Sequence, residues 1–309
     1  MVVKVSINGE RFILLSSPML YFLVKIGVAP NKNTLLPPFT GKAVKSLLMK
    51  ANPSLETIFE PPTQTYSPKP IKITPFTTDD KVYMWVRHGS NKVMEAKAGE
   101  TLYFYIGFKE HVAHLVFQAL EKLIDGVQLF NTEWRLTEFT EILKAEIPVE
   151  NPPLDLTKIQ AITVELKTPA KLIDPYKKTP YGRFLPVAGF LFAYNIGDIV
   201  SSKKKREKDY WHLINIANAV LQETHSAPET IKRVFYIYKG KPLPGLYGYI
   251  KYHICHNTLT PETNTLLANT ILHAQIMGIG SGRATGFGHI KIKTQPTNQT
   301  HQEKQTLTQ

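Results

Sequence analysis

Apolar positions recur along the chain at two spacings, one typical of strands and one typical of helices. Residues 1–7 alternate as a strand does, and Asn8-Gly9 is typical of a hairpin turn into a second strand over 11–16. Residues 41–51 have apolar positions at helical spacing. By the same criteria, the rest of the first half predicts a helix over 110–124 and strands over 71–76, 82–87, 101–108 and 140–148.

The second half repeats this order of elements after a proline-rich boundary at Asn151–Leu154. It predicts strands over 159–168, 231–238, 246–254 and 288–293, and helices over 186–201, 209–223 and 262–276. Each half therefore follows the split βαβ pattern of the ferredoxin-like fold, which also underlies the RRM module. We predict an α+β protein with two tandem ferredoxin-like (RRM-like) domains, over 1–150 and 151–294, and a polar tail over 295–309.

Composition points to a polyanionic partner. The chain has 37 Lys and Arg against 25 Asp and Glu, a formal net charge of +12. Such a balance favours nucleic acid first and an anionic membrane surface second, unless the charge serves only solubility. The most apolar stretch, 184–199, is too short to cross a bilayer, so we expect no membrane partner. The single cysteine, Cys255, excludes an internal disulfide and a multi-cysteine zinc site, and is compatible with a reducing cytoplasm.

Residues 278–288 form the most unusual segment, Gly-Ile-Gly-Ser-Gly-Arg-Ala-Thr-Gly-Phe-Gly. Glycine lets a backbone approach a ligand closely, and Arg283 adds a cation. A dinucleotide-binding loop is excluded because Arg283 stands where its third glycine would be, and a nucleotide P-loop is excluded because Gly-Lys-Ser/Thr is absent. The segment predicts a loop that contacts an anion, with a plain turn into the last strand as the alternative.

The spacing of these glycines at the end of the second half resembles the signature loop of the CRISPR-associated RAMP superfamily. Two further segments, Leu166–Pro169 and Gly245–Lys251, resemble parts of one family within it, and Pro180–Pro186 with the helix after it resembles the segment found in crenarchaeal members. That family is the endoribonuclease that cuts CRISPR repeat transcripts, the sixth Cas protein family. The resemblance covers nearly all of residues 1–293.

The resemblance implies a metal-independent cut with no cofactor, in which an RNA 2′-hydroxyl attacks the adjacent phosphate. The products would be a 2′,3′-cyclic phosphate and a 5′-hydroxyl, and the cut would release guide RNAs from precursor transcripts. The implied partner is CRISPR repeat RNA. A CRISPR effector complex and a second copy of the chain, as a homodimer, are further expected partners.

Lysines stand where many members of this family carry a catalytic histidine. No histidine lies between residues 31 and 76. Lys42 and Lys45 are three apart and share a face of the first predicted helix, and Lys69 lies in Ser-Pro-Lys-Pro. Crenarchaeal members without the histidine resemble this chain in these lysines, which implies that lysines form the active site. Lys241 is expected where those relatives place a basic residue facing the cluster, although each lysine could instead be a solvated surface residue.

Two basic or glycine-rich segments are the candidate RNA contacts. The glycine-rich loop would hold the RNA backbone, and the basic run after the helix at 186–201 would contact phosphate or simply be solvated. The residues concerned are Gly278, Gly280, Ser281, Gly282, Arg283, Gly286, Gly288, Lys203, Lys204, Lys205 and Arg206.

Two other functions remain open from the sequence. The first alternative is a non-catalytic RAMP subunit that binds guide RNA inside an effector complex. The second is a ferredoxin-like RNA-binding module unrelated to CRISPR, which the sequence favours less because the aromatic pairs of an RRM sheet are not evident.

Overall fold

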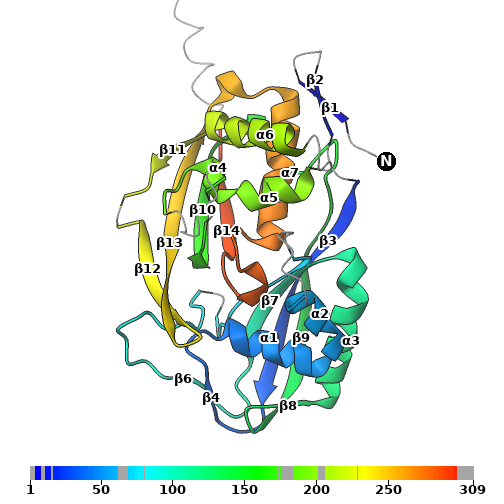
Figure 1. Ribbon diagram of the computed structural model, residues 1–309, viewed down its shortest axis with the longest axis vertical. Helices are drawn as coiled ribbons and strands as arrows, with labels where there is room; N and C mark the ends of the chain where they lie inside the picture. The colour runs from blue at the N-terminus through cyan, green and yellow to red at the C-terminus, as the bar shows by residue number, and fades with distance from the viewer. Residues whose placement is uncertain are drawn as a thin grey trace, which may run out of the picture.

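Two five-stranded antiparallel sheets form the centre of the molecule, one in each half of the chain (Figure 1). The computed structural model describes residues 4–7, 11–14, 17–61, 69–79, 81–172, 174–175, 184–200, 206–227 and 229–297. No helix among these residues is long and apolar enough to cross a membrane.

The first sheet has the strand order of a ferredoxin-like fold. Its strands lie in the order β5 (Ile71–Ile73), β7 (Leu102–Lys109), β3 (Met19–Pro30), β9 (Thr132–Ile147) and β8 (Val127–Leu129). Helix α1 (Gly41–Ala51) follows β3 and helix α3 (Ala113–Asp125) follows β7. The first, second, third and fourth strands of the split βαβ motif are therefore β3, β5, β7 and β9.

The second sheet repeats this order. Its strands lie in the order β11 (Leu221–His225), β13 (Lys241–Ile254), β10 (Ile159–Ala170) and β14 (Ile290–Pro296), and β12 (Ile231–Tyr238) also pairs with β13. Its helices are α4 (Ala188–Leu191), α5 (Ala193–Ile199), α6 (Arg206–Val220) and α7 (Pro261–Met277). The predicted α+β protein with two ferredoxin-like folds is confirmed.

Smaller elements surround the two sheets. They are two two-stranded sheets, β1 (Lys4–Ile7) with β2 (Arg11–Leu14) and β4 (Thr34–Leu36) with β6 (Met94–Ala96), and a short helix, α2 (Glu56–Phe59). Five 3₁₀ turns complete the described elements, at Pro53–Leu55, Glu110–Val112, Leu156–Lys158, His256–Thr258 and Arg283–Thr285.

The structure differs from the sequence-based prediction at several elements. The first sheet strand is β3, which the pattern analysis passes over because most of its residues are buried or half-buried on both faces, so that no alternation is visible. The predicted strand at 82–87 is a set of isolated bridges, at Tyr83, Trp85 and Arg87. The predicted helix over 186–201 is broken at Phe192 into α4 and α5.

Some sequence predictions lie outside the described residues. They are the Asn8-Gly9 turn, most of the proline-rich loop at 62–68, and the polar tail from residue 298.

Helix α7 joins the two halves. Twelve of its residues are buried, and a helix that is apolar on all sides is typical of a protein core. One side packs on the second sheet, and Leu272, Ile276 and Met277 pack against Tyr21 and Leu23 of β3. The first sheet is thus covered by α1 and α3 on one face and by the C-terminal part of α7 on the other (Figure 1).

A buried pair of basic side chains lies where the halves meet. Lys72 of β5 is fully buried, and its Nζ lies 2.7 Å from Nδ1 of His289, which is also buried. Burial, and then the charge of Arg283, lowers the pKa of Lys72 to about 7. Burial also holds the pKa of His289 well below its usual value, so both side chains tend toward their neutral forms.

We predict that Lys72 makes the protein less stable as the pH falls from about 10 to 7. In that range the unfolded chain binds a proton on Lys72, whose ordinary pKa is 10.5, whereas the folded chain does not, so stability rises with pH. The melting temperature of the wild type should therefore rise between pH 7.5 and 9.5 more than that of Lys72→Met. The exposed Lys50→Met variant is the control and should behave as the wild type; equal pH dependence in all three proteins would contradict the prediction.

Candidate active site

The first helix begins directly against the glycine-rich loop. The hydroxyl of Thr40 donates to the carbonyl of Met84 at 2.7 Å and accepts from the amide of Phe76 at 2.9 Å, which fixes the chain just before α1. A Cβ on Gly41 would lie 2.4 Å from the carbonyl oxygen of Thr285, so only glycine permits this approach. The predicted lysine helix and the predicted glycine loop are therefore neighbours, although they come from opposite ends of the chain.

Two of the predicted catalytic lysines lie on α1 in different environments. Lys42 is exposed near the start of the helix, whereas the side chain of Lys45 is only 12% exposed. The Nζ of Lys45 donates to Oε1 of Glu60 at 2.5 Å and lies 5.7 Å from the ring centre of Phe59. The hydrogen bond and the charge of Lys45 lower the pKa of Glu60, so this carboxylate stays ionised beside the lysines.

The third predicted lysine, Lys69, joins the same group. Its half-buried ammonium donates to the carbonyl of Phe59. Burial and the charge of Lys45 lower the pKa of Lys69, and Glu60 only partly opposes this. Lys69 is therefore easier to deprotonate than an exposed lysine, which is the property that a lysine needs to act as a base.

A fourth lysine comes from the second half and was not predicted. Tyr238 pairs with Lys241 across the β12–β13 hairpin, which leaves Lys239 and Gly240 as a two-residue turn with φ of +51° and +74°. Positive φ at both positions defines a type I′ turn, in which lysine is an unusual first residue. Lys239 and Lys42 line one pocket of about 100 Å³, and the charge of Lys239 also acts on Glu60. We call Lys42, Lys45, Lys69 and Lys239 the lysine cluster.

The other predicted basic residues are Lys241, next to this hairpin turn, and a run that lies largely outside the described residues. Lys241 directly follows the hairpin turn and is exposed. Lys203, Lys204 and Lys205 lie outside the described residues, and Arg206 is the first residue of α6, with its side chain not described. A signal for Lys239 was present in the sequence, since Lys-Gly separates two β-rich runs, but the predicted strand began only at residue 246.

The glycine loop takes a backbone path that side chains would prevent. The φ angles of its glycines are +69° at Gly278, +65° at Gly280, +80° at Gly282, +105° at Gly286 and +69° at Gly288. These angles lie in the region that glycine alone adopts readily. At Gly288, a Cβ would also lie 1.9 Å from a carbonyl oxygen, so the loop has no room for another residue there.

Several amides of the loop are bonded within the protein. Ile279 donates to the carbonyl of Gly288 at 2.8 Å, and Ser281 donates to that of Lys171 at 2.8 Å. Gly288 donates to the carbonyl of Pro169 at 3.0 Å. The first bond closes the loop on itself, and the other two tie it to Pro169 of β10 and to Lys171 just after this strand.

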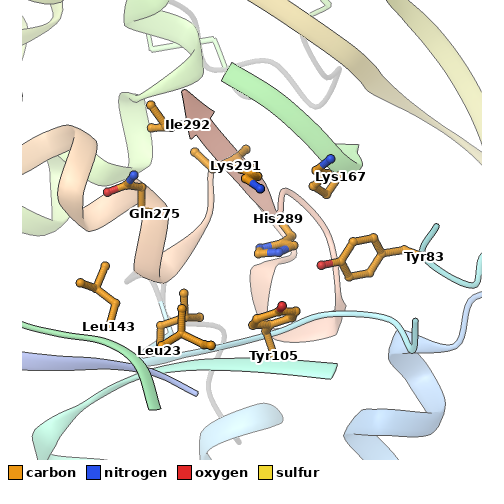
Figure 2. Close-up of a pocket in the computed structure, with 11 residues that line it drawn as sticks. Leu23, Tyr83, Tyr105, Leu143, Lys167, Gln275, His289, Lys291 and Ile292 are labelled. Atoms are coloured by element: carbon orange, nitrogen blue, oxygen red, sulfur yellow. The ribbon is translucent and has the colours of Figure 1, made fainter. Parts of the chain in front are cut away.

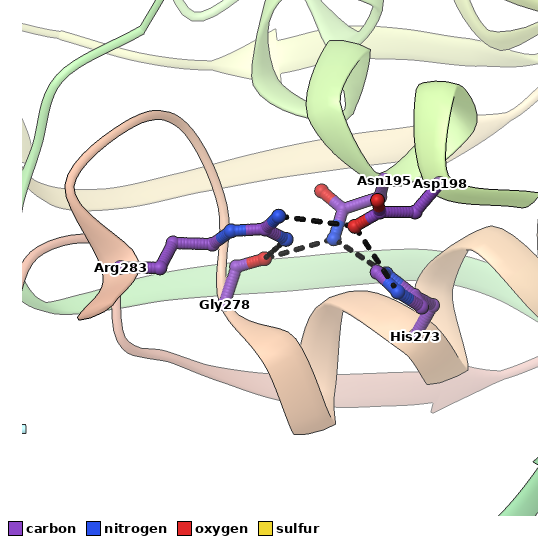
Figure 3. Close-up of polar contacts among 5 residues, drawn as sticks. All are labelled: Asn195, Asp198, His273, Gly278 and Arg283. Carbon is purple, nitrogen blue, oxygen red and sulfur yellow. Dashed lines mark hydrogen bonds and ion pairs between the residues drawn. The ribbon is translucent and has the colours of Figure 1, made fainter. Parts of the chain in front are cut away.

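The predicted RNA contact Arg283 is engaged inside the molecule (Figure 3). It is 5% exposed, and its Nη2 donates to Oδ2 of Asp198 at 3.0 Å. Asn195 donates to the carbonyl of Gly278 at 2.8 Å, and its Nδ2 also lies 3.0 Å from Nδ1 of His273. That Arg283 contacts the RNA backbone stays a prediction, while its ion pair with Asp198 anchors the loop to α5.

The protonation states of this buried group follow from its contacts. Burial lowers the pKa of His273 to about 3, so its ring is neutral. With Asn195 donating to Nδ1, the ring proton is on Nε2, which lies 3.4 Å from Asp198, too far for a strong hydrogen bond. Burial raises the pKa of Asp198, but the charge and hydrogen bond of Arg283, together with other nearby positive groups, outweigh burial and hold this pKa below its usual value. The group therefore contains one buried ion pair, Arg283 with Asp198.

Comparisons with known proteins agree with this architecture. Residues 22–142, which include Lys42, Lys45 and Lys69, match the family model of the Cas6 N-terminal domain. No curated protein sequence is significantly similar to the chain.

Three solved structures share the fold over most of their length. A Cas6 product complex has a TM-score of 0.61 and 16% identity, over 89% of this chain and 99% of its own. A Thermus thermophilus Cas6 has a TM-score of 0.56 and 15% identity, over 90% and 100%. The product of a Cas6-related gene from Pyrococcus furiosus has a TM-score of 0.52 and 12% identity, over 88% and 98%. At these identities the likeness concerns the fold.

We predict that Arg283→Met lowers the free energy of unfolding by about 3–5 kcal/mol, because Asp198 is left as an unpaired buried charge. The double variant Arg283→Met, Asp198→Asn should recover part of this loss, with a coupling of about 0.5–3 kcal/mol. Urea denaturation measures both values. The exposed Arg233→Met variant is the control and should change stability little, and equal losses in the single and double variants would contradict the assigned ion pair.

Proposed function

We propose that this protein is a metal-independent endoribonuclease that binds CRISPR repeat RNA and cuts precursor transcripts into guide RNAs. The observation that carries the proposal is the lysine cluster, in which three lysines of the first half meet Lys239 from the second half beside the glycine loop. The match to the Cas6 N-terminal domain and the shared fold support it. We place the protein with the Cas6 proteins of crenarchaeal type, in which lysines replace the usual histidine.

The cluster contains the groups that this reaction needs. The 2′-oxygen of the RNA forms a bond to the adjacent phosphorus, and the bond from phosphorus to the 5′-oxygen breaks. Lys69, whose pKa is lowered, accepts the proton of the 2′-hydroxyl. Lys42 and Lys239 are exposed cations that stabilise the charge on the phosphorane, and one of these ammonium groups gives a proton to the leaving 5′-oxygen.

Lys45 and Glu60 organise the cluster in this scheme. Burial, and then the charge of Lys45, lowers the pKa of Lys69, and Glu60 holds Lys45 in place through their hydrogen bond. Because Glu60 is more than half exposed, RNA phosphates entering the site compete with it for the lysines.

We also propose that the glycine loop and several basic residues hold the RNA backbone. The glycine loop offers a fixed backbone next to α1, and Arg283, Lys241 and the basic run at 203–206 remain the proposed phosphate contacts. We further propose a cytoplasmic location and association with a CRISPR effector complex or with a second copy of the chain.

We predict that Lys42→Ala, Lys69→Ala and Lys239→Ala each slow cleavage by about 10²-fold, while the affinity for uncut RNA changes little. Single-turnover cleavage of CRISPR repeat RNA in EDTA measures the rate, and the product ends should be a cyclic phosphate and a 5′-hydroxyl. Lys50→Ala, at the exposed end of α1, is the matched control. Tight RNA binding by the wild type without any cut would instead indicate the non-catalytic RAMP subunit.

The pH dependence of the cut gives a separate prediction. The rate should rise with pH as Lys69 loses its proton, and the rise should level off below the ordinary lysine pKa of 10.5, because burial and Lys45 lower the pKa of Lys69. Lys45→Ala removes the charge that lowers this pKa, so the rising part of its pH–rate profile should shift to higher pH. An unshifted profile would contradict the proposed effect of Lys45 on Lys69.

A further inference from the structure

A second pocket, of about 480 Å³, lies between the two halves and shares no lining residue with the lysine cluster (Figure 2). Leu23, Tyr83 and Tyr105 of the first half line it together with Lys167, His289 and Lys291 of the second half. Its volume is within the range of sites that hold small organic ligands, and it would accommodate one nucleotide.

Aromatic rings form one wall of this pocket. The rings of Tyr105 and His289 are stacked, with centroids 5.2 Å apart and an angle of 27° between the planes. Tyr83 meets the same imidazole edge-on at 5.3 Å, and Figure 2 shows both tyrosines next to His289. Flat aromatic walls of this kind hold nucleobases by stacking.

His289 also offers a polar atom to a ligand. The residue is 7% exposed and Nδ1 of its ring is engaged with Lys72. The bond to Lys72 uses Nδ1 and not Nε2, and His289 lines the pocket. Burial, together with the charges of Lys72 and Lys167, lowers its pKa well below the usual value, so the ring is neutral and suited to a hydrogen bond with a base edge.

Cations stand at the rim of the pocket. Lys167 is paired with Glu165 at 2.9 Å, and Lys293 pairs with the same carboxylate. Lys291 is exposed and takes part in no ion pair among the described residues. An aromatic and apolar pocket with such a cation at its edge is suited to a ligand that contains both a flat ring and a phosphate.

We propose that this pocket binds one unpaired nucleotide of an RNA strand, with its base against Tyr105 and His289 and its phosphate beside Lys291. The proposal rests on the RNA binding proposed above and adds to it a place where a single base is held away from the lysine cluster. It also gives the protein a contact that depends on the base, which phosphate contacts alone do not supply.

The test combines a blocked pocket with an abasic scan of the RNA. The probe is fluorescein-labelled CRISPR repeat RNA with a 2′-deoxy nucleotide at the cut, so that binding is measured without cleavage. In the wild type, one abasic position outside the cut should weaken binding by about 5- to 100-fold. Ile142→Trp, at the half-exposed rim, should weaken binding of the intact RNA similarly and remove the effect of that abasic position.

A second variant tests the phosphate contact, and each of the two variants has its own control. Thr140→Trp places the same ring on exposed β9 outside the pocket and should bind as the wild type does. Lys291→Ala, which leaves the pocket walls intact, should weaken binding at least threefold, whereas Lys293→Ala on the same strand should change it less than twofold.

The outcomes separate the two proposals. If the wild type binds the RNA but neither Ile142→Trp nor Lys291→Ala differs from its control, the pocket is not a nucleotide site and the proposed function stands. If the wild type binds no RNA, both proposals are overturned. Loss of the abasic effect in Ile142→Trp alone, with Thr140→Trp unchanged, supports the nucleotide site.

Discussion

The close approach of two backbones, at places where no side chain fits, determines the arrangement of this molecule. A Cβ on Gly107 of β7 would lie 2.2 Å from the carbonyl oxygen of Ile276, and one on Gly41 would lie 2.4 Å from that of Thr285. Because these two glycines admit α7 and the loop after it, the second half sits directly on the first sheet and on the start of α1. The lysine cluster and the pocket between the halves both exist because of this contact.

Positive side chains of this molecule are found in two kinds of environment. One is a buried ion pair, and the other is an excess of cations with few carboxylates. Arg283 is buried and neutralised by Asp198, so its charge is used to fix the glycine loop. Lys72 is buried against a neutral histidine, and the lysine cluster has one carboxylate, Glu60, near several cations. An excess of positive charge with a single exposed anion is suited to receive a phosphate.

The sequence predicted the topology well and the site in part. The split βαβ order and helix α1 follow from periodicity, and the positions of Lys42, Lys45 and Lys69 could be listed from the helix spacing and the family resemblance. The sequence pattern did not predict β3, because a strand that is covered on both faces has no alternation of apolar and polar residues. Local sequence patterns did not identify three residues whose roles depend on tertiary contacts between distant elements: Lys239, Asp198 and His289.

The position of α7 also bears on modularity. By connectivity this helix belongs to the second half, yet its Leu272 and Ile276 fill the back of the first sheet against Tyr21 and Leu23. A fragment containing only the first half would expose this apolar surface to water and would be prone to aggregate. The two halves share one topology, as duplicated modules do, but α7 supplies apolar side chains to both, so neither half has a complete core without it.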